Sequence, residues 1–216
     1  MSYSSSVVRV QWKRRCITPV PKTAQPVTCA DYRHISVTPV LSRVMERLTV
    51  FVRRDLYPVL VHPDFSNLFC DQFAFRHTGS TTAALVFLFH HLSHMPQDHK
   101  SVHLIALDFS KAFYTVRHST LAAKISSFPI SDNVYNWIVN FLSDSQHQTR
   151  ANDSRSYFKS INASIIQGSG LGPVAYILNA SDLCSAHQSN LIFKYADDLS
   201  FLLLTCNYTI GNATHL

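Results

Sequence analysis

The chain has little glycine and no long apolar run. Only five of its 216 residues are glycine, and three of them, Gly168, Gly170 and Gly172, fall within five positions. No Gly-Lys-Ser or Gly-Lys-Thr follows this cluster and no βαβ pattern surrounds it, so neither a Walker loop nor a dinucleotide site is predicted. The apolar runs are far shorter than the roughly 20 residues needed to cross a bilayer. The sequence therefore argues against a Walker-type nucleotide-binding protein, a dinucleotide-binding protein and a protein with a membrane-spanning helix.

Paired cysteines and a secretory leader are also absent. The five cysteines are scattered, odd in number and form no Cys-x-x-Cys pair, which argues against a disulfide scaffold or a zinc knuckle. Five Asn-x-Ser/Thr sequons occur, but no apolar signal region follows the first methionine. We therefore expect an intracellular protein, nuclear or cytoplasmic, that is neither secreted nor bound to a membrane.

Positive charge is concentrated at the front of the chain. Residues 1–60 carry ten Lys and Arg against three Asp and Glu, whereas residues 61–216 carry nine against ten. A basic face suits a phosphate backbone or a nucleoside triphosphate. A merely solvated basic surface is the alternative.

Two adjacent carboxylates lie at the tip of a predicted β-hairpin. Tyr195-Ala196-Asp197-Asp198 stands between apolar segments, and neighbouring negative charges raise each other's pKa unless a cation neutralises them. Asp108 ends another apolar run, 102–107, and two such strands side by side would bring three carboxylates together. Carboxylate oxygens suit Mg²⁺ or Mn²⁺. Two such ions, about 3.5–4 Å apart, form the clamp used for in-line nucleotidyl transfer.

The rest of the pattern indicates helices and strands in alternation. Prolines make the first forty residues an extended, looping segment. Apolar periodicity predicts a helix from Leu41 to about Leu56, and Ser80 is the expected N-cap of a helix that reaches His94. Further predicted elements are helices over 119–125, 132–142 and 173–183, a strand over 157–166, and a hairpin over 191–204.

Six ordered motifs resemble those of reverse transcriptases, and more narrowly of non-LTR (LINE-like) retrotransposons. The palm-like motifs are Asp108-Phe109-Ser110-Lys111-Ala112-Phe113, Gln167-Gly168-Ser169-Gly170-Leu171-Gly172-Pro173 and Tyr195-Ala196-Asp197-Asp198. The fingers-like motifs are Pro19-Val20-Pro21-Lys22, Asp31-Tyr32-Arg33-His34-Ile35-Ser36 and Asp71-Gln72-Phe73-Ala74-Phe75-Arg76. The resemblance implies an α+β fold, with right-hand polymerase fingers over residues 1–100 and a palm over 101–216. The palm would be an antiparallel sheet with helices packed on one face. Since eighteen residues follow Asp198, we expect the thumb to be absent.

The resemblance also implies roles for single residues and an activity. The chain would be a reverse transcriptase fragment that adds dNTPs to a DNA primer on an RNA template, with two Mg²⁺ or Mn²⁺ ions. Asp108, Asp197 and Asp198 would be the catalytic residues. The metal ligands would be these three residues and Phe109. Nucleotide binding would fall to Lys22, Arg33, Phe113, Gln167 and Gly168, and primer contact to Tyr195. Phe113 would lie under the sugar and select deoxynucleotides.

Two residues depart from the pattern of LINE-like elements. Tyr114 occupies a place where Asp is common, and His34 stands where Pro is usual. The runner-up interpretation is a catalytically silent, truncated retroelement remnant that at most binds nucleic acid, and it rests mainly on the expected absence of the thumb. Separately, the alternative for Phe113 is a core aromatic at the start of a helix, and the alternative for Tyr195 is packing in the sheet.

Two further alternatives concern metal chemistry of another kind. A metal-dependent hydrolase could use the same carboxylates, but the basic front of the chain would then have no purpose. His90 and His94 have the spacing of zinc ligands, but no Glu follows His90 as a metalloprotease requires. A partly exposed helix face is the expected structure there.

Overall fold

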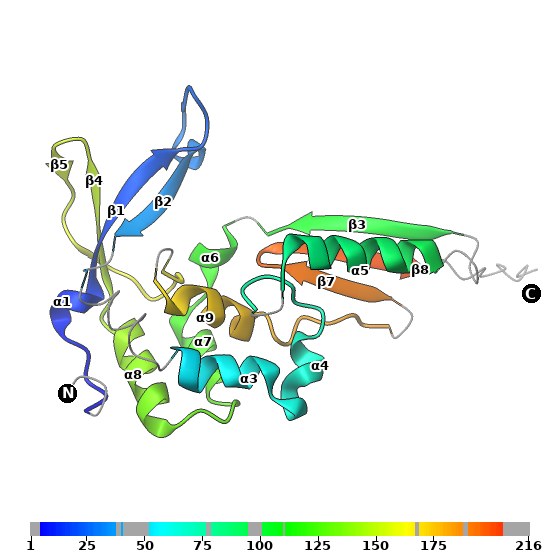
Figure 1. The fold of residues 1–216 in the computed structure, drawn as a ribbon. Coiled ribbons are helices and arrows are strands. Elements are labelled where there is room, and N and C mark those ends of the chain that lie inside the picture. The colour runs from blue at the N-terminus through cyan, green and yellow to red at the C-terminus, as the bar shows by residue number, and fades with distance from the viewer. Residues whose placement is uncertain are drawn as a thin grey trace, which may run out of the picture. The chain divides into compact units, whose positions relative to one another are not determined.

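The protein forms two compact units, each built from two separate stretches of chain (Figure 1). The computed structural model describes residues 5–37, 40, 52–76, 79–94, 101–109, 111–166, 169–187 and 190–204. Unit 1 comprises Met1–Phe69 and Lys111–Ser181, and unit 2 comprises Cys70–Ser110 and Asp182–Leu216. Both units combine helices with sheet, which confirms the α+β class. The assignment of fingers to 1–100 and palm to 101–216 remains a prediction.

Unit 2 is an antiparallel sheet with a helix against it. The strand order is β3-β8-β7, and α5 contacts β7. The elements are α5 (Thr81–His94), β3 (Val102–Asp108), β7 (Leu191–Tyr195) and β8 (Asp198–Leu204). The strand that ends at Asp108 and the closing hairpin are thus confirmed. Ser80 caps α5 from the position before its first residue, as predicted, because its Oγ accepts a hydrogen bond of 3.0 Å from the Ala83 amide.

Aromatic rings join α5 to the sheet. The Phe87 ring lies 5.2 Å from that of Phe73 and 6.2 Å from that of Phe193, measured between centroids. The opposite edge of the sheet is different, because Leu104, Ile105 and Leu107 of β3 are more than 40% exposed. Successive residues of a strand face opposite sides, so β3 is open on both of its faces.

Unit 1 contains a mixed sheet surrounded by helices. Strand β1 pairs antiparallel with β2 and parallel with β4. The strands are β1 (Arg14–Pro21), β2 (Tyr32–Val37), β4 (Gln146–Ala151), β5 (Ser154–Arg155) and β6 (Lys159–Ser160). The helices are α1 (Val10–Lys13), η1 (Cys29–Asp31), η2 (Val52–Leu56), α3 (Tyr57–Val61), η3 (Pro63–Phe65), α4 (Ser66–Phe69), α6 (Ala112–Thr115), α7 (His118–Ile125), α8 (Asp132–Leu142) and α9 (Leu171–Asn179).

The core of unit 1 forms where amphipathic helices meet. In α8, Val134, Trp137, Ile138 and Phe141 are buried at the i, i+3, i+4 and i+7 positions of one helix face. The rings of Trp137 and Phe141 stack at 5.1 Å. Helix α7 contacts both α8 and α9, whose apolar residues complete the cluster. The predicted helices over 119–125 and 132–142 are confirmed.

Three predictions about unit 1 were wrong in part. The proline-rich front is not a loop but contains the β1–β2 hairpin, and two of its prolines, Pro19 and Pro21, lie near the end of β1. The strand expected over 157–166 shrinks to β6, and farther along the chain Ser164, with a φ of 99°, departs from extended geometry. The helix expected over 173–183 is α9, which begins and ends earlier. Most of the helix expected over 41–56 lies outside the described residues, and η2 is a π-helix.

None of the helices among the described residues is long and apolar enough to cross a membrane.

Candidate functional site

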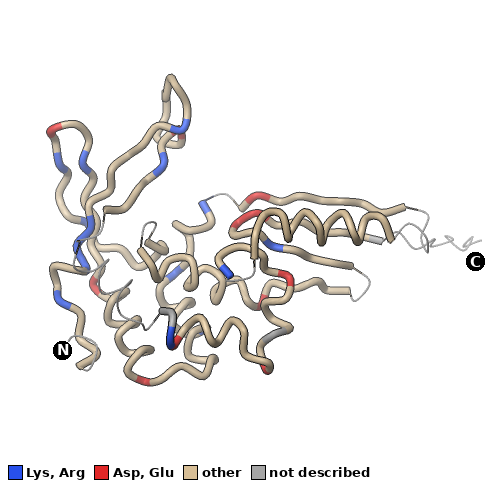
Figure 2. Tube along the Cα trace, viewed as in Figure 1, with Lys and Arg blue, Asp and Glu red and all other residues tan. Residues whose placement is uncertain are grey.

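The sheet of unit 2 places two of the predicted carboxylates opposite each other. Asp108, the last residue of β3, is the cross-strand partner of Asp198, the first residue of β8. On its other side Asp198 is paired with Tyr195 of β7. Side chains of directly opposed residues project from the same face, so Asp108, Asp198 and Tyr195 form one row. Figure 2 shows this concentration of acidic residues where β3 ends beside the β7–β8 turn.

A two-residue turn carries the third carboxylate. Because Tyr195 pairs with Asp198, only Ala196 and Asp197 connect the strands. Ala196 has a φ of 56°, which a tight hairpin requires at its first turn residue but which is unfavourable for any residue with a Cβ. The strained turn keeps Asp197 at the tip, next to the row formed by the other two carboxylates.

The three carboxylates influence one another electrostatically. Burial, followed by the negative charges of Asp197 and Asp108, raises the pKa of Asp198 above its ordinary value. A cation at this point would relieve the repulsion, and oxygen donors of this kind suit a hard divalent ion. Within the described part of the chain, however, no three His, Cys, Asp or Glu side chains are grouped closely enough to hold a metal ion. The carboxylates are therefore neighbours, but they do not form an assembled set of ligands.

Gln72 braces the turn from a neighbouring segment. Its side chain is 2% exposed, and its Oε1 accepts hydrogen bonds from the amides of Ala196, at 3.3 Å, and Ala74, at 3.0 Å. Two backbone hydrogen bonds join the same segment to β7. The Phe73 amide donates to the Lys194 carbonyl at 2.8 Å, and the Lys194 amide donates to the Asp71 carbonyl at 2.7 Å. The segment that begins at Asp71 thus borders β7 and supports the acidic turn.

A buried ion pair fixes the same segment to β7. Lys194 is 3% exposed, and its Nζ lies 2.9 Å from Asp71 Oδ1 and donates to the Leu183 carbonyl at 2.8 Å. Burial raises the pKa of Asp71, and the Lys194 ammonium opposes that shift. Sequence reasoning assigned Asp71–Arg76 to the fingers and missed Lys194 and the role of Gln72. The available signal was a single lysine within the otherwise apolar strand that precedes the acidic turn.

The predicted cations of unit 1 lie on the β1–β2 hairpin, which carries several of the basic residues in Figure 2. Lys22 and Arg33 are both exposed. Arg33 is paired with Val20, and the Lys22 amide donates to the Asp31 carbonyl at 2.7 Å, which extends the ladder toward the loop. Asp31 Oδ2 accepts from the amides of Val27 and Thr28, and these bonds lower the pKa of the Asp31 carboxyl. The loop is therefore ordered, while both cations remain accessible.

The predicted sugar gate is part of a helix that packs in unit 1. Phe113 of α6 is half-buried and stacks on Tyr176 of α9, with ring centroids 4.4 Å apart. The two departures from the LINE-like pattern contact each other. The Tyr114 hydroxyl donates to the His34 carbonyl at 3.4 Å, and the two rings meet edge to face at 5.3 Å. Tyr114 and His34 are thus in direct contact, although they lie 80 residues apart in the sequence.

The glycine-rich segment is described only from Ser169 onward, so Gln167 and Gly168 lie outside the described residues. Ser169 Oγ accepts a hydrogen bond of 2.9 Å from the Gly172 amide at the start of α9. A Cβ at Gly172 would lie 2.6 Å from the Ile166 carbonyl oxygen, so only glycine fits there. Phe109, the remaining predicted metal ligand, follows β3 and is 42% exposed.

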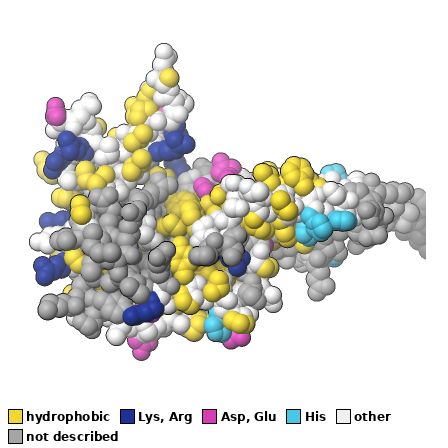
Figure 3. All heavy atoms as spheres, in the orientation of Figure 1, with side chains coloured by type: hydrophobic (Ala, Val, Ile, Leu, Met, Phe, Trp, Pro, Cys, Tyr) yellow, Lys and Arg dark blue, Asp and Glu magenta, His cyan; other side chains and the backbone are white. Residues whose placement is uncertain are grey.

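His90 and His94 of α5 lie on an exposed helix face. The rings of His90 and His94 are 4.4 Å apart and border a shallow pocket with Leu85, Val86 and Phe89. Figure 3 shows this mixture of apolar and histidine side chains over α5. No third metal-binding side chain joins them among the described residues.

The chain is similar to one protein family and to several known proteins. The family described as "Reverse transcriptase (RNA-dependent DNA polymerase)" matches residues 20–208. The chain is 30% identical over 202 residues to the probable RNA-directed DNA polymerase from transposon BS of Drosophila melanogaster, covering 89% of this chain and 21% of that protein. It is 29% identical to the RNA-directed DNA polymerase from mobile element jockey of the same species, covering 88% and 21%. It is 24% identical to the retrovirus-related Pol polyprotein from type-1 retrotransposable element R2 of Popillia japonica, covering 90% and 28%.

The fold has solved relatives as well. Apo telomerase from Candida tropicalis, truncated from its C-terminal domain, superposes with a TM-score of 0.61 at 13% identity, covering 91% of this chain and 44% of that chain. This likeness concerns the fold alone. The chain spans about a fifth to a quarter of the length of the curated relatives named above. With most of its length matched by one family, the chain belongs to the reverse transcriptases, and its curated relatives are polymerases of non-LTR retrotransposons.

Proposed function

We propose that the chain is the part of an RNA-directed DNA polymerase that carries the catalytic carboxylates and the nucleotide-binding cations. The observation that carries this proposal is the pairing of Asp108 with Asp198 beside a turn that presents Asp197. The raised pKa of Asp198 means that ionising it beside the other two carboxylates is unfavourable. Bound divalent cations would offset this repulsion. The proposed substrates are dNTPs, a DNA primer and an RNA template.

Each unit would supply a different part of the chemistry. In unit 2, Asp108, Phe109, Asp197 and Asp198 would hold divalent ions. Bound there, a pair of Mg²⁺ or Mn²⁺ ions would activate the primer 3′-hydroxyl and neutralise the leaving pyrophosphate. Tyr195 would contact the primer end from the same face of the sheet.

The roles proposed for unit 1 follow from its matched motifs. Arg33 offers a planar fork and Lys22 a point charge for the triphosphate, and both are accessible on the β1–β2 hairpin. Phe113 would select the sugar, and Gln167 and Gly168 would complete the nucleotide pocket. The units would thus divide the work into nucleotide binding and phosphoryl chemistry.

Primer extension tests the proposal. The chain is assayed alone and fused to the segment that follows the matched region in the transposon BS protein. The fusion should incorporate dNTPs on an RNA template in Mg²⁺ or Mn²⁺ and stop when EDTA is added. A fusion that folds and binds the hybrid but never extends it would replace the enzyme with a nucleic-acid-binding remnant.

Asp198 provides a test that needs no activity. Because its folded pKa lies above the ordinary value of 3.8, Asp198 stabilises the fold only while protonated, and this contribution is lost as the pH rises through the folded pKa. In metal-free buffer at pH 7, Asp198→Asn should therefore raise the melting temperature slightly, and below pH 3 it should not. Mn²⁺ or Mg²⁺ should raise the melting temperature of the native chain more than that of the variant.

The control is Asp153→Asn, which removes the same charge from the exposed turn between β4 and β5. It should leave both the pH effect and the metal effect unchanged. Equal stabilisation of all three proteins by the cation would mean that the carboxylate row does not bind it.

Phe113→Val tests sugar selection in the active fusion. If the ring excludes a 2′-hydroxyl, the variant should accept ribonucleotides while keeping most of its dNTP incorporation, measured as the ratio of the two kcat/KM values. The competing explanation is that Phe113 only packs against Tyr176, on which its ring stacks. Were Phe113 only a packing residue, both activities would fall together and the melting temperature would drop.

A further inference from the structure

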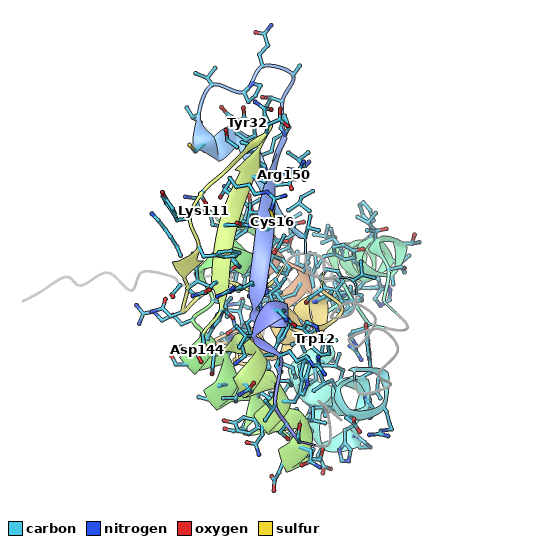
Figure 4. The ribbon with its side chains drawn as sticks, turned by 90° about the vertical axis from the view of Figure 1, so that its left-hand side faces the viewer. Trp12, Cys16, Tyr32, Lys111, Asp144 and Arg150 are labelled. Atoms are coloured by element: carbon cyan, nitrogen blue, oxygen red, sulfur yellow. The ribbon has the colours of Figure 1, made fainter. Side chains whose placement is uncertain are left out.

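Unit 1 contains a pocket that is lined by none of the residues with a proposed role in the polymerase reaction. Its volume is about 350 Å³, and it lies on one face of the β2-β1-β4 sheet. Figure 4 shows β1 and β4 side by side, with Cys16 and Arg150 marking the two strands. The lining side chains from this sheet are those of Ile17, His34, Ser36 and His147. Tyr114 and the chain from 160 to 166 form the remaining wall.

The strand register explains why these side chains meet. Ile17 is directly opposite Ser36 in the antiparallel pair, so both project from one face. In the parallel pair, Ile17 is opposite Thr149, two residues beyond His147, which therefore faces the same side. His34 lies two residues before Ser36 and joins them. The pocket is thus built by the sheet itself.

Two polar side chains in the pocket lack partners among the described residues. Ser36 is 8% exposed, yet its buried Oγ makes no hydrogen bond there. The buried Nε2 of His147 is likewise unpaired. A buried polar group without a hydrogen-bond partner destabilises the folded state. Both groups line a space large enough for a small molecule, which would supply the missing bonds.

The charged groups in and near the pocket indicate what charge its ligand should carry. Burial, then Arg15 and then His118, lower the pKa of His147 to about 4, so its imidazole is neutral at pH 7. No Asp, Glu, Lys or Arg lines the pocket among the described residues, and much of the wall is aliphatic: Ile17, Ile161, Ala163, Ile165 and Ile166. A charged ligand would therefore lose its hydration without finding an oppositely charged side chain in the lining. A neutral ligand fits best.

The unpaired groups also set the hydrogen-bonding pattern. Neutral imidazole Nε2 either donates or accepts, depending on its tautomer, and the Ser36 hydroxyl does either. A ligand that offers both a donor and an acceptor satisfies either arrangement. The aromatic rings of Tyr114 and His34 favour a flat partner.

We propose that this pocket binds a neutral, planar heteroaromatic molecule of one or two rings, which pairs with Ser36 and His147 through one donor and one acceptor. The site lies entirely in unit 1 and does not depend on the polymerase reaction.

The test uses 7-azaindole as the probe, because it carries a ring N–H beside a ring nitrogen. Indole is the matched comparison, since it has the same size and lacks only the acceptor. Binding is followed by ¹⁵N–¹H spectra of the histidine rings. Saturable binding of 7-azaindole should shift the His147 signals, and indole should bind about tenfold more weakly, the usual effect of one lost hydrogen bond to a buried group.

Variants locate the site. Ser36→Ala and His147→Phe should each weaken 7-azaindole binding about tenfold, while Gln148→Ala, on the opposite face of β4, should not change it. Circular dichroism checks that each variant is folded. Equal affinity for the two probes on the native chain, or no saturable binding of 7-azaindole, would overturn the proposal without any variant, and the pocket would then hold only water.

Discussion

Asp197→Asn is expected to abolish dNTP incorporation by the fusion without loss of folding. The amide occupies nearly the same volume as the carboxylate, but it carries no charge and ligates Mg²⁺ poorly. Asp197 lies at the tip of the hairpin and is partly buried, so a replacement of nearly equal volume should preserve its packing. Primer extension on an RNA template measures the activity, and the melting temperature reports on the fold.

The matched control is again Asp153→Asn, which changes the net charge equally and should retain full activity. Asp108→Asn should be as inactive as Asp197→Asn, because both would hold the same ions. If Asp197→Asn keeps a substantial part of the activity, the carboxylate row is not the catalytic centre.

Lys194→Met is expected to cost about 3–5 kcal/mol of stability, the usual loss when one partner of a buried ion pair is removed. The variant leaves Asp71 and the Leu183 carbonyl without the ammonium that now contacts both. Methionine fills a similar volume, so the loss would reflect charge and hydrogen bonding rather than a cavity. Urea unfolding of the chain measures the change.

A double variant separates the ion pair from general damage to the strand. Adding Asp71→Leu to Lys194→Met removes both charges, and replacing a buried pair by apolar residues is often close to neutral. The double variant should therefore recover much of the lost stability. If the double variant instead loses the sum of the stability lost by Lys194→Met alone and by Asp71→Leu alone, Lys194 and Asp71 do not stabilise each other.

The sequence predicted the acidic part of the site because local patterns determine it. The apolar run before Asp108 and the two runs around Tyr195-Ala196-Asp197-Asp198 identify strands and a turn, and strands that end in carboxylates bring them to one edge of a sheet. Helices α5 and α8 were equally clear from the Ser80 cap and from the spacing of Val134, Trp137, Ile138 and Phe141. In each case the signal lies within a few residues of the feature.

The supports of the site could not be predicted, because they depend on partners far away in the chain. Nothing local to Gln72 shows that its amide binds Ala196, 124 residues later. The hairpin of β1 and β2 was also missed, since prolines suggested a loop and the pairing of β1 with β4 involves residues more than 120 positions apart. His34 and Tyr114 looked like two independent departures until the structure showed their contact.

The exposed edge strand β3 has a consequence during synthesis. Its partner β8 begins 90 residues after β3 ends, beyond the whole second stretch of unit 1. At about 5–20 residues per second, a ribosome needs roughly 5–20 seconds to supply that partner. Meanwhile Val102–Asp108 is an apolar segment with nothing to pair with, and such segments aggregate readily. Slower translation lengthens this interval, so the yield of soluble chain should depend on chaperones that shield the nascent strand.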